Sequence, residues 1–398
     1  MTRTLVPALL LVLLLGGAAP GKSVFRVTAA DGDPYEAVLL GSAANELHFA
    51  TDAEQSGVAL GAILRMVRQA PPAKSARGAV RLELVSGDRL EGWIVGGSED
   101  GIRFRLVDKG AVTKLPLESI RVLRYQRAGG PRIEALDREG PHAVVSTDVL
   151  HVRSRDAILS MRAAVRRIDE KGATVLWEGK ERTVPRDWLE GIVLAGDDVE
   201  PPGGLRVILT LLRGDHLVGS LAASAQGSVS VRLAMGIVIA VPVREIGRIE
   251  VRGGSADYLS EMDPSLVEET PWFVDNRWPY RRDACVAGSP LRVLGTEYAK
   301  GLGTHSRCRL TYEIGGRYRR FRALAALDDS APAIANAVVR VLVDGQPAAE
   351  PVTLRPGEDP WEAEIDLTDA KRLTLVVEFG EACDVGDRVD WCDARLVR

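Results

Sequence analysis

Short runs of alternating apolar and polar residues fill most of this chain, and glycine, aspartate or proline stands between them. From residue 24 to residue 252 the runs are about five residues long, the usual length of a strand. Alternation with a period of two is the pattern of strands that bury one face. The pattern therefore predicts an all-β protein.

Two of these segments can be laid over each other. They are Val80–Gly92 (VRLELVSGDRLEG) and Val207–Gly219 (VILTLLRGDHLVG). The Gly-Asp turns are 127 residues apart (214 − 87), and so are the closing glycines (219 − 92). Each segment continues through two further strands to a Pro-x-x-x-Ile element, which begins at Pro116 in the first and at Pro242 in the second.

A strand, a Gly-Asp turn that tolerates positive φ and a strand ending in glycine make a strongly bent hairpin. With further strands such a hairpin can close a small barrel without open edges. Fainter copies cover residues 24–69, with Gly32-Asp33 at the turn and Ile63 near the close, and residues 145–195, with Asp156, Pro185 and Ile192. The units resemble small SH3-like or Sm-like barrels.

Clusters of proline and glycine separate these segments and mark domain boundaries, because neither residue supports continued strand pairing. The predicted division is a signal peptide (1–22), barrel-like repeats at 23–70, 78–127 and 203–252, a divergent β repeat at 132–196, and a last domain at 255–398.

The first residues predict an export signal. Arg3 provides positive charge, Ala8–Leu15 is wholly apolar, and small residues follow. The run is shorter than the ~20 residues of a membrane-spanning helix, and the alternative of a short buried helix would lack a polar face. No cysteine follows the run to accept a lipid anchor. We expect a secreted, periplasmic or cell-surface protein without a transmembrane segment.

Charge argues against a nucleic-acid partner. The net charge is −4, and no block of lysine and arginine occurs. Sm-like barrels bind RNA through basic and aromatic rims, but export and acidity oppose that role here. The repeats are left with a packing role or with docking other exported proteins.

Five separated motifs in the last third occur in the order found in the NPCBM family, which stands beside glycoside hydrolase catalytic domains. They are KGLGTHS (300–306), YEIGGRYRRF (312–321), LDD (327–329), VRVLVDG (339–345) and DWCDA (390–394). The resemblance implies a carbohydrate-binding module with a galactose-binding-like jelly-roll β-sandwich. Four alternating segments independently predict strands: Arg309–Ile314, Val338–Val343, Ala363–Leu367 and Leu373–Phe379.

Sugar recognition needs aromatic faces and planar polar side chains. The segment Trp272–Asp283 supplies both and is predicted to be a loop over one end of the sandwich. The candidate glycan contacts are Arg277, Trp278, Tyr280, His305, Asp390 and Trp391. Alternatives stay open for five of them. Trp278 and Tyr280 could merely cover the core. Trp391 could pack in the core, His305 could bond backbone carbonyls, and Asp390 could pair with a neighbouring arginine.

Two further sets of side chains could have structural roles. Asp328 and Asp329 could cap a turn or coordinate a structural calcium ion. Cys285, Cys308, Cys383 and Cys392 are an even number in a chain predicted to be exported, which favours two disulfides. Three pairings are possible, and a bridge between Cys383 and Cys392 across a short turn is the one we favour. The spacings contain no short Cys-x-x-Cys pair, so zinc is not favoured.

Catalysis has little support. The chain has no Gly-x-Ser-x-Gly, no His-Glu-x-x-His and no phosphate-binding loop, and its five histidines lie in different segments. No cofactor is implied. The sequence therefore predicts a non-catalytic, lectin-like exported protein that binds a galactose-type or related glycan. The alternative is an interaction scaffold without sugar affinity.

Overall fold

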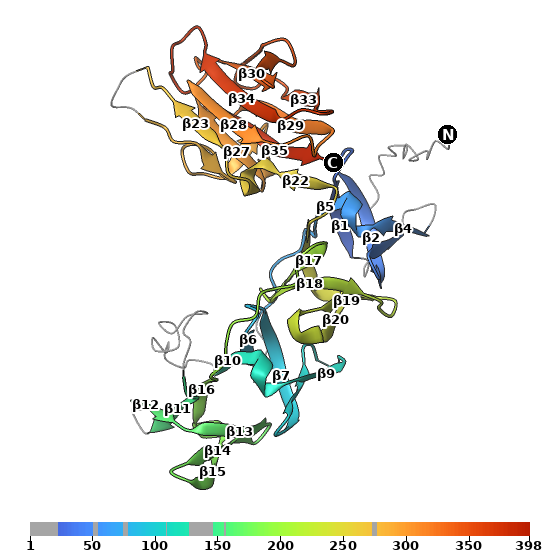
Figure 1. The fold of residues 1–398 in the computed structure, drawn as a ribbon, viewed down its shortest axis with the longest axis vertical. Helices are drawn as coiled ribbons and strands as arrows, with labels where there is room; N and C mark the ends of the chain where they lie inside the picture. Colours follow the sequence, from blue (N-terminus) through green and yellow to red (C-terminus); the bar gives the residue numbers. More distant parts are fainter. Residues whose placement is uncertain are drawn as a thin grey trace.

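The computed structural model describes residues 23–50, 55–74, 79–108, 110–126, 146–154, 157–272 and 277–398. Regular structure in these ranges consists of strands and single 3₁₀ turns, so the prediction of an all-β protein is confirmed. Four small units are followed by a larger C-terminal part (Figure 1). The predicted signal peptide lies outside the described residues.

Each small unit is a meander of antiparallel strands with one 3₁₀ turn before its last strand. Unit 1 contains β1 (Val24–Ala29), β2 (Tyr35–Ala43), β3 (Glu46–Ala50), β4 (Gln55–Ala59), η1 (Leu60–Ala62) and β5 (Ile63–Val67). Unit 2 contains β6 (Val80–Leu84), β7 (Arg89–Ser98), β8 (Gly101–Arg105), β9 (Val112–Leu115), η2 (Leu117–Ser119) and β10 (Ile120–Tyr125). Unit 3 contains β11 (Val149–Ser154), β12 (Ala157–Arg162), β13 (Ala164–Asp169), β14 (Gly172–Trp177), β15 (Lys180–Pro185), η3 (Arg186–Trp188) and β16 (Leu189–Val193). Unit 4 contains β17 (Arg206–Leu211), β18 (His216–Ala222), β19 (Ser228–Arg232), η4 (Ala234–Gly236), β20 (Val238–Pro242), η5 (Val243–Glu245) and β21 (Ile246–Arg252). Barrel closure and the predicted domain boundaries stay predictions.

The two Gly-Asp turns have the same backbone geometry. Gly87 and Gly214 adopt φ of 82° and 92°, which glycine reaches without the steric cost of a Cβ. In each turn the residue before the loop donates its N–H to the aspartate carbonyl, Leu84 to Asp88 and Leu211 to Asp215. The repeat seen in the sequence is therefore a repeat of structure.

Glycines at the bends of β7 and β18 allow close packing of backbone. A Cβ on Gly92 would lie 2.3 Å from the carbonyl oxygen of Arg105, and one on Gly219 would lie 2.2 Å from that of Arg232. Such contacts are far inside van der Waals distance. The long second strand can cross its partner here only without a side chain.

Proline initiates the 3₁₀ turn before the last strand in units 2, 3 and 4. Pro116, Pro185 and Pro242 have φ of −56°, −60° and −59°, the value the pyrrolidine ring imposes. In unit 3 the last strand begins at Leu189, so Leu189 and not Ile192 takes the position of the predicted closing isoleucine. Asp156, predicted at the turn of this unit, lies outside the described residues.

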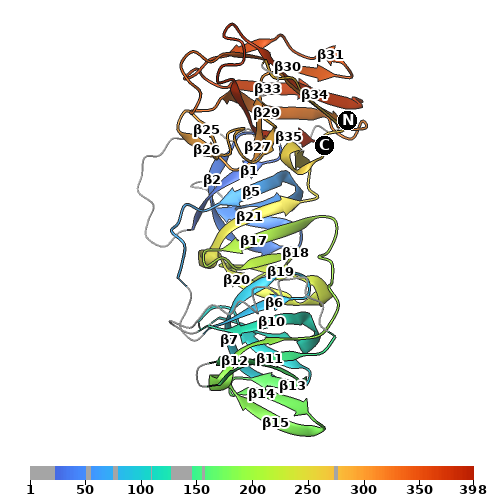
Figure 2. The ribbon, with the colours of Figure 1, turned by 90° about the vertical axis from the view of Figure 1, so that its left-hand side faces the viewer.

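The units are stacked in an order that differs from their order in the chain. The last strands of units 1 and 4 pair through β5 and β21, and those of units 2 and 3 pair through β10 and β16. Units 4 and 2 meet at β18 and β7, where His216 lies opposite Arg89. The resulting order is 1, 4, 2, 3 down one long axis, which Figure 2 shows.

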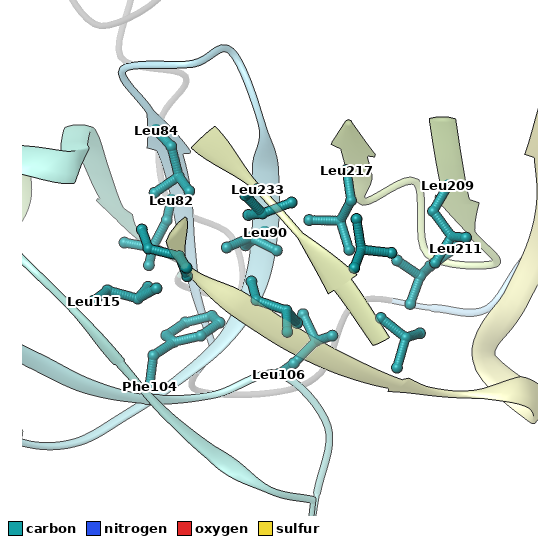
Figure 3. Close-up of a cluster of buried hydrophobic side chains, with 14 of the residues drawn as sticks. Leu82, Leu84, Leu90, Phe104, Leu106, Leu115, Leu209, Leu211, Leu217 and Leu233 are labelled. Carbon is teal, nitrogen blue, oxygen red and sulfur yellow. The ribbon is translucent and has the colours of Figure 1, made fainter. Parts of the chain in front are cut away.

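One continuous apolar core runs through the stack. Buried side chains from all four units belong to a single cluster. Figure 3 shows Leu90 of unit 2 beside Leu233 of unit 4. Burial of apolar surface between units favours a stack over units that hang separately.

The C-terminal part is a sandwich of two antiparallel sheets. One sheet has the order β24 (Arg281–Arg282), β27 (Gly301–His305), β35 (Arg388–Val397), β29 (Arg320–Leu327) and β33 (Trp361–Asp366), with β22 (Ala256–Tyr258) beside β35. The other has the order β23 (Leu266–Glu269), β28 (Cys308–Glu313), β34 (Arg372–Phe379), β30 (Ala337–Val343) and β31 (Gln346–Pro347), with β32 (Val352–Leu354) beside β30. A separate hairpin consists of β25 (Leu291–Val293) and β26 (Thr296–Tyr298), and η6 (Leu259–Glu261) follows β22. Side chains of both sheets fill one core, as a sandwich requires. The four strands predicted here correspond to β28, β30, β33 and β34.

The sandwich docks on the first turn of unit 1. The buried Arg395 donates to the carbonyl oxygens of Ala30 and Gly32, at 3.2 and 3.1 Å. Asp31 accepts from Arg319 and Arg320 at 2.9 and 3.1 Å. A small apolar cluster lies beneath these contacts and joins Ala30, Leu64, Ala256, Tyr258 and Val397.

Candidate functional site

Several loops meet at one end of the sandwich, where β23, β27, β29 and β34 finish. The N–H of Thr270 donates to the carbonyl of Arg307, and the N–H of Glu381 donates to the Asn336 side chain. Arg388 Nη1 donates to the Ser330 carbonyl at 2.8 Å. We call this surface the loop end. Loops carried by a rigid sheet are where binding residues usually lie.

Trp272 presents an aromatic face at the loop end. The residue is 51% exposed. Its ring and that of Phe379 are nearly perpendicular, with centroids 5.1 Å apart and 86° between the ring planes. Its backbone N–H donates to Asp384 Oδ2 at 3.2 Å. The indole is thus held in place while about half of the residue stays open to solvent.

Trp278 covers His305 instead of standing free. The two rings are stacked, with centroids 5.4 Å apart at 14°, and the Arg388 guanidinium lies 5.9 Å from the Trp278 ring centroid. His305 is 6% exposed, and its Nδ1 lies 2.9 Å from the Ser306 carbonyl oxygen. Burial lowers the pKa of His305, which favours the neutral imidazole.

Burial and the Ser306 contact favour the structural reading of His305 that the sequence left open. Ser306 in turn donates its hydroxyl to the buried Asp387. Burial raises the pKa of Asp387 to about 6. These side chains support the surface from below and do not form it.

The other two predicted contacts from the aromatic segment differ in exposure. Arg277 is exposed. Tyr280 is half-buried and packs against the sandwich core, and its N–H donates to Glu269 Oε1 at 2.6 Å. Part of the predicted loop is in fact strand, because Arg281 and Arg282 pair with β27. Residues 273–276 of this loop lie outside the described residues.

Asp390 and Trp391 were wrongly predicted as glycan contacts. Both have 0% exposure, because β35 lies in the middle of its sheet and is covered on both faces. Trp391 packs in the sandwich core against Trp361, with ring centroids 6.4 Å apart. Neither side chain offers a surface to a ligand.

Asp328 and Asp329 point to different places. Asp329 accepts the N–H groups of Leu294 and Gly295, each at 2.8 Å, and so caps the turn between β25 and β26. Asp328 is buried, and its carboxylate lies beside the Cys285 thiol and the Asp390 carboxylate. The two do not form one cation site together, and calcium binding stays a prediction.

The four cysteines are free thiols in the structure, which contradicts the prediction of two disulfides. The two cysteines of the favoured pair, Cys383 and Cys392, lie in different parts of the secondary structure. Cys392 is buried within β35, whereas Cys383 lies in the turn after β34 with φ of 62°. Cys308 is buried at the start of β28 and Cys285 is buried in the loop after β24.

A depression of about 260 Å³ lies on the outer face of the sheet that contains β23, β28 and β34. Its rim carries two ion pairs between neighbouring strands, Arg307 with Glu378 at 2.9 Å and Arg309 with Glu268 at 3.7 Å. Because these charges are paired with each other, the depression offers hydrogen-bonding groups but little net charge.

Sequence reasoning missed three residues of the loop end. Trp272 lies in the aromatic segment singled out, whereas the buried Asp384 belongs to the β34–β35 connection and Arg388 begins β35. The density of aromatic residues around Trp272 was an available signal. Nothing in the local sequence pairs residue 272 with residue 384.

None of the helices among the described residues is long and apolar enough to cross a membrane.

Among the curated proteins, a Renibacterium salmoninarum protein named "Putative endo-alpha-N-acetylgalactosaminidase" is 29% identical to this chain over 110 residues. That match covers 28% of this chain and 7% of the relative, so this chain spans a small fraction of that protein.

Two solved structures show similarity. A CBM51 domain of GH95 from Clostridium perfringens, in complex with methyl-galactose, is 21% identical with a TM-score of 0.33, and the match covers 36% of this chain and 99% of that one. The tandem CBM51 modules of a family 98 glycoside hydrolase from Streptococcus pneumoniae are 13% identical with a TM-score of 0.31, and the match covers 83% and 96% of the two chains. The family model described as "NPCBM/NEW2 domain" matches residues 255–397, the part of this chain that forms the C-terminal sandwich.

Proposed function

We propose that this chain is an exported, non-catalytic protein that binds a glycan through the loop end of its NPCBM/NEW2 domain. The glycan is of the galactose type or a related one, the class that the family resemblance implies. The observation that carries the proposal is the half-exposed Trp272, whose ring is held nearly perpendicular to that of Phe379 and whose backbone N–H is bound by Asp384.

The chemistry of this surface suits a sugar. A pyranose has an apolar C–H face that packs on an aromatic ring, and its hydroxyls need planar donors and acceptors around that ring. The partly exposed Arg388 supplies hydrogen-bond donors at the loop end, and Trp278 adds a second aromatic surface. A fixed ring also loses little conformational freedom when a ligand binds.

A glycan-array screen of the full chain tests the proposal, with three substitutions compared. Trp272→Ala removes the exposed ring, and Trp278→Ala removes the ring that covers His305. Trp188→Ala is the matched control, because Trp188 is 59% exposed but lies in η3 of unit 3, at the far end of the stack.

We expect selective binding by the wild type and by Trp188→Ala, and loss of binding by at least tenfold in Trp272→Ala, about the effect of one well-packed aromatic contact. Equal binding by all three variants would show that the glycan binds outside the loop end. A silent array from folded protein would refute glycan binding and favour the alternative below.

The alternative is an exported interaction scaffold without sugar affinity. The specific observation that favours it is the surface of unit 3, where Leu159 and Trp188 are 56% and 59% exposed on a unit that ends the stack. Exposed large apolar side chains at one end suit docking of another protein. Capture of a defined exported partner that depends on Leu159 and not on Trp272 would support this function.

A further inference from the structure

One cysteine and two aspartate side chains from distant parts of the C-terminal domain lie close together in its interior. The Cys285 thiol, an Asp328 carboxylate oxygen and an Asp390 carboxylate oxygen all lie within 4.8 Å of one another. Their residues are 0%, 3% and 0% exposed. Asp390 comes from β35, Asp328 follows β29 directly, and Cys285 lies in the loop before β25. Three groups that can each lose a proton are thus packed together away from water.

Asp390 is the member of this cluster whose bonding is incomplete. Neither of its carboxylate oxygens accepts a hydrogen bond from a donor group among the residues that the structure describes, although it can share a proton with the neighbouring Asp328 carboxylate. Asp328, by contrast, accepts the N–H groups of Arg292 and Ser330 at 3.2 and 3.0 Å. A buried carboxylate without a partner carries a large desolvation cost, so such groups are usually paired or bound to a metal ion.

The cluster needs positive charge if its members are to ionise. Burial and the neighbouring Asp328 raise the pKa of Asp390 to about 9, and burial raises the pKa of Cys285 to about 11. Burial also acts on Asp328, but hydrogen bonds from Ser330 hold its pKa below the usual value.

We propose that Cys285, Asp328 and Asp390 form a binding site for a divalent transition-metal ion of the zinc type. A thiolate and two carboxylates are ligands that zinc accepts, and three protein ligands leave one position of a tetrahedron for water or another donor. Calcium instead takes six to eight oxygen ligands and does not favour a thiolate. A coordinating thiol must give up its proton, so metal binding releases the proton of Cys285.

No local pattern reveals this site, because its ligands are 43 and 62 residues apart (328 − 285 and 390 − 328). Short Cys-x-x-Cys spacing identifies sites built on one turn, whereas this one combines one strand and two loops. The competing arrangement requires no metal: a protonated Asp390 donates a hydrogen bond to Asp328.

Cobalt(II) binding to the full chain, prepared reduced and free of metal, separates these arrangements. We expect one Co²⁺ per chain, a thiolate-to-cobalt charge-transfer band, and loss of that band when Zn²⁺ is added. Cys285→Ser should abolish the band, and Asp390→Asn should weaken binding by more than the roughly 10–100-fold loss typical of residues one shell further out. Cys308→Ser is the matched control, because Cys308 is an equally buried thiol on β28, outside the cluster.

Several results would overturn the proposal. One is a folded wild-type protein that binds no Co²⁺, and another is a band that survives Cys285→Ser. A thermal shift produced by Ca²⁺ and unchanged in Cys285→Ser would indicate an oxygen site instead. Thiol titration that finds Cys285 oxidised with Cys392 would exclude it as a ligand. If the variants fail to fold, the wild-type spectrum still shows whether a thiolate binds the cobalt ion, because a thiolate ligand must give the charge-transfer band.

Discussion

Asp88 and Asp215 hold units 2 and 4 together by exchanging the same hydrogen bond. The N–H of Val218 donates to Asp88 Oδ1 at 2.6 Å, and the N–H of Glu91 donates to Asp215 Oδ1. Each donor lies three residues after the aspartate of its own turn. The 127-residue repeat therefore places two equal turns against each other around an approximate two-fold axis, and both carboxylates are buried.

Replacing either aspartate should weaken this junction. Asp88→Ala and Asp215→Ala each leave a buried backbone N–H without an acceptor, which should lower the free energy of unfolding by about 1–3 kcal/mol. Denaturant unfolding followed by tryptophan fluorescence measures the change. Asp100→Ala is the control, since that side chain is 82% exposed. Values for the buried pair within about 0.5 kcal/mol of this control would show that the junction does not depend on the exchange.

Asp88 should also make the free energy of unfolding depend on pH. Burial raises the pKa of Asp88 from 3.8 to about 6, so between these values the folded state binds more protons than the unfolded state. The contribution of Asp88 to stability is therefore greatest below about pH 4 and is lost as the pH rises through about 6. Asp88→Asn, which stays neutral, should remove this part of the slope. Denaturation midpoints across that range, compared with the wild type, check it, and identical slopes would contradict it.

The bend glycines should not tolerate a methyl group. Gly92→Ala and Gly219→Ala place a Cβ within 2.3 and 2.2 Å of a carbonyl oxygen of the facing strand. Because backbone must move, we expect a loss of about 1–3 kcal/mol or more in unfolding free energy. Gly203→Ala serves as the control, because no atom lies within 4 Å of its added Cβ. A melting temperature unchanged in all three variants would mean that the strands separate at no cost.

Removing Arg395 should loosen the sandwich from unit 1. This buried side chain donates to two carbonyl oxygens of the first turn, Ala30 and Gly32. Arg395→Ala should increase the radius of gyration in small-angle X-ray scattering and speed proteolysis between units 4 and the sandwich, near Gly253. Arg340→Ala, an exposed residue on β30, is the control. Unchanged scattering and cleavage would show that Asp31 and the apolar cluster suffice.

The candidate site could be predicted in part. The segment around Trp272 and Trp278 was identifiable by its density of aromatic and polar residues, since sugar contacts need both. Asp390 and Trp391 belong to the DWCDA motif of the family resemblance, which does not show whether its strand has an exposed face. β35 has none, because the sandwich core covers one face and other parts of the chain cover the other. Exposure in a central strand depends on what packs against it, which no local pattern records.

By itself, the sequence determined the strands, the repeated Gly-Asp hairpin and the NPCBM resemblance of the last domain. These follow from interactions between near neighbours: side-chain alternation, turns that need positive φ, and prolines that fix the last 3₁₀ turn. Only the tertiary structure decided that the units stack in the order 1, 4, 2, 3, that Asp88 faces Asp215, and that Cys285, Asp328 and Asp390 meet. Those contacts join residues 43 to 183 positions apart, as in the pairing of Met66 with Ile249 (249 − 66), and depend on which apolar faces bury each other.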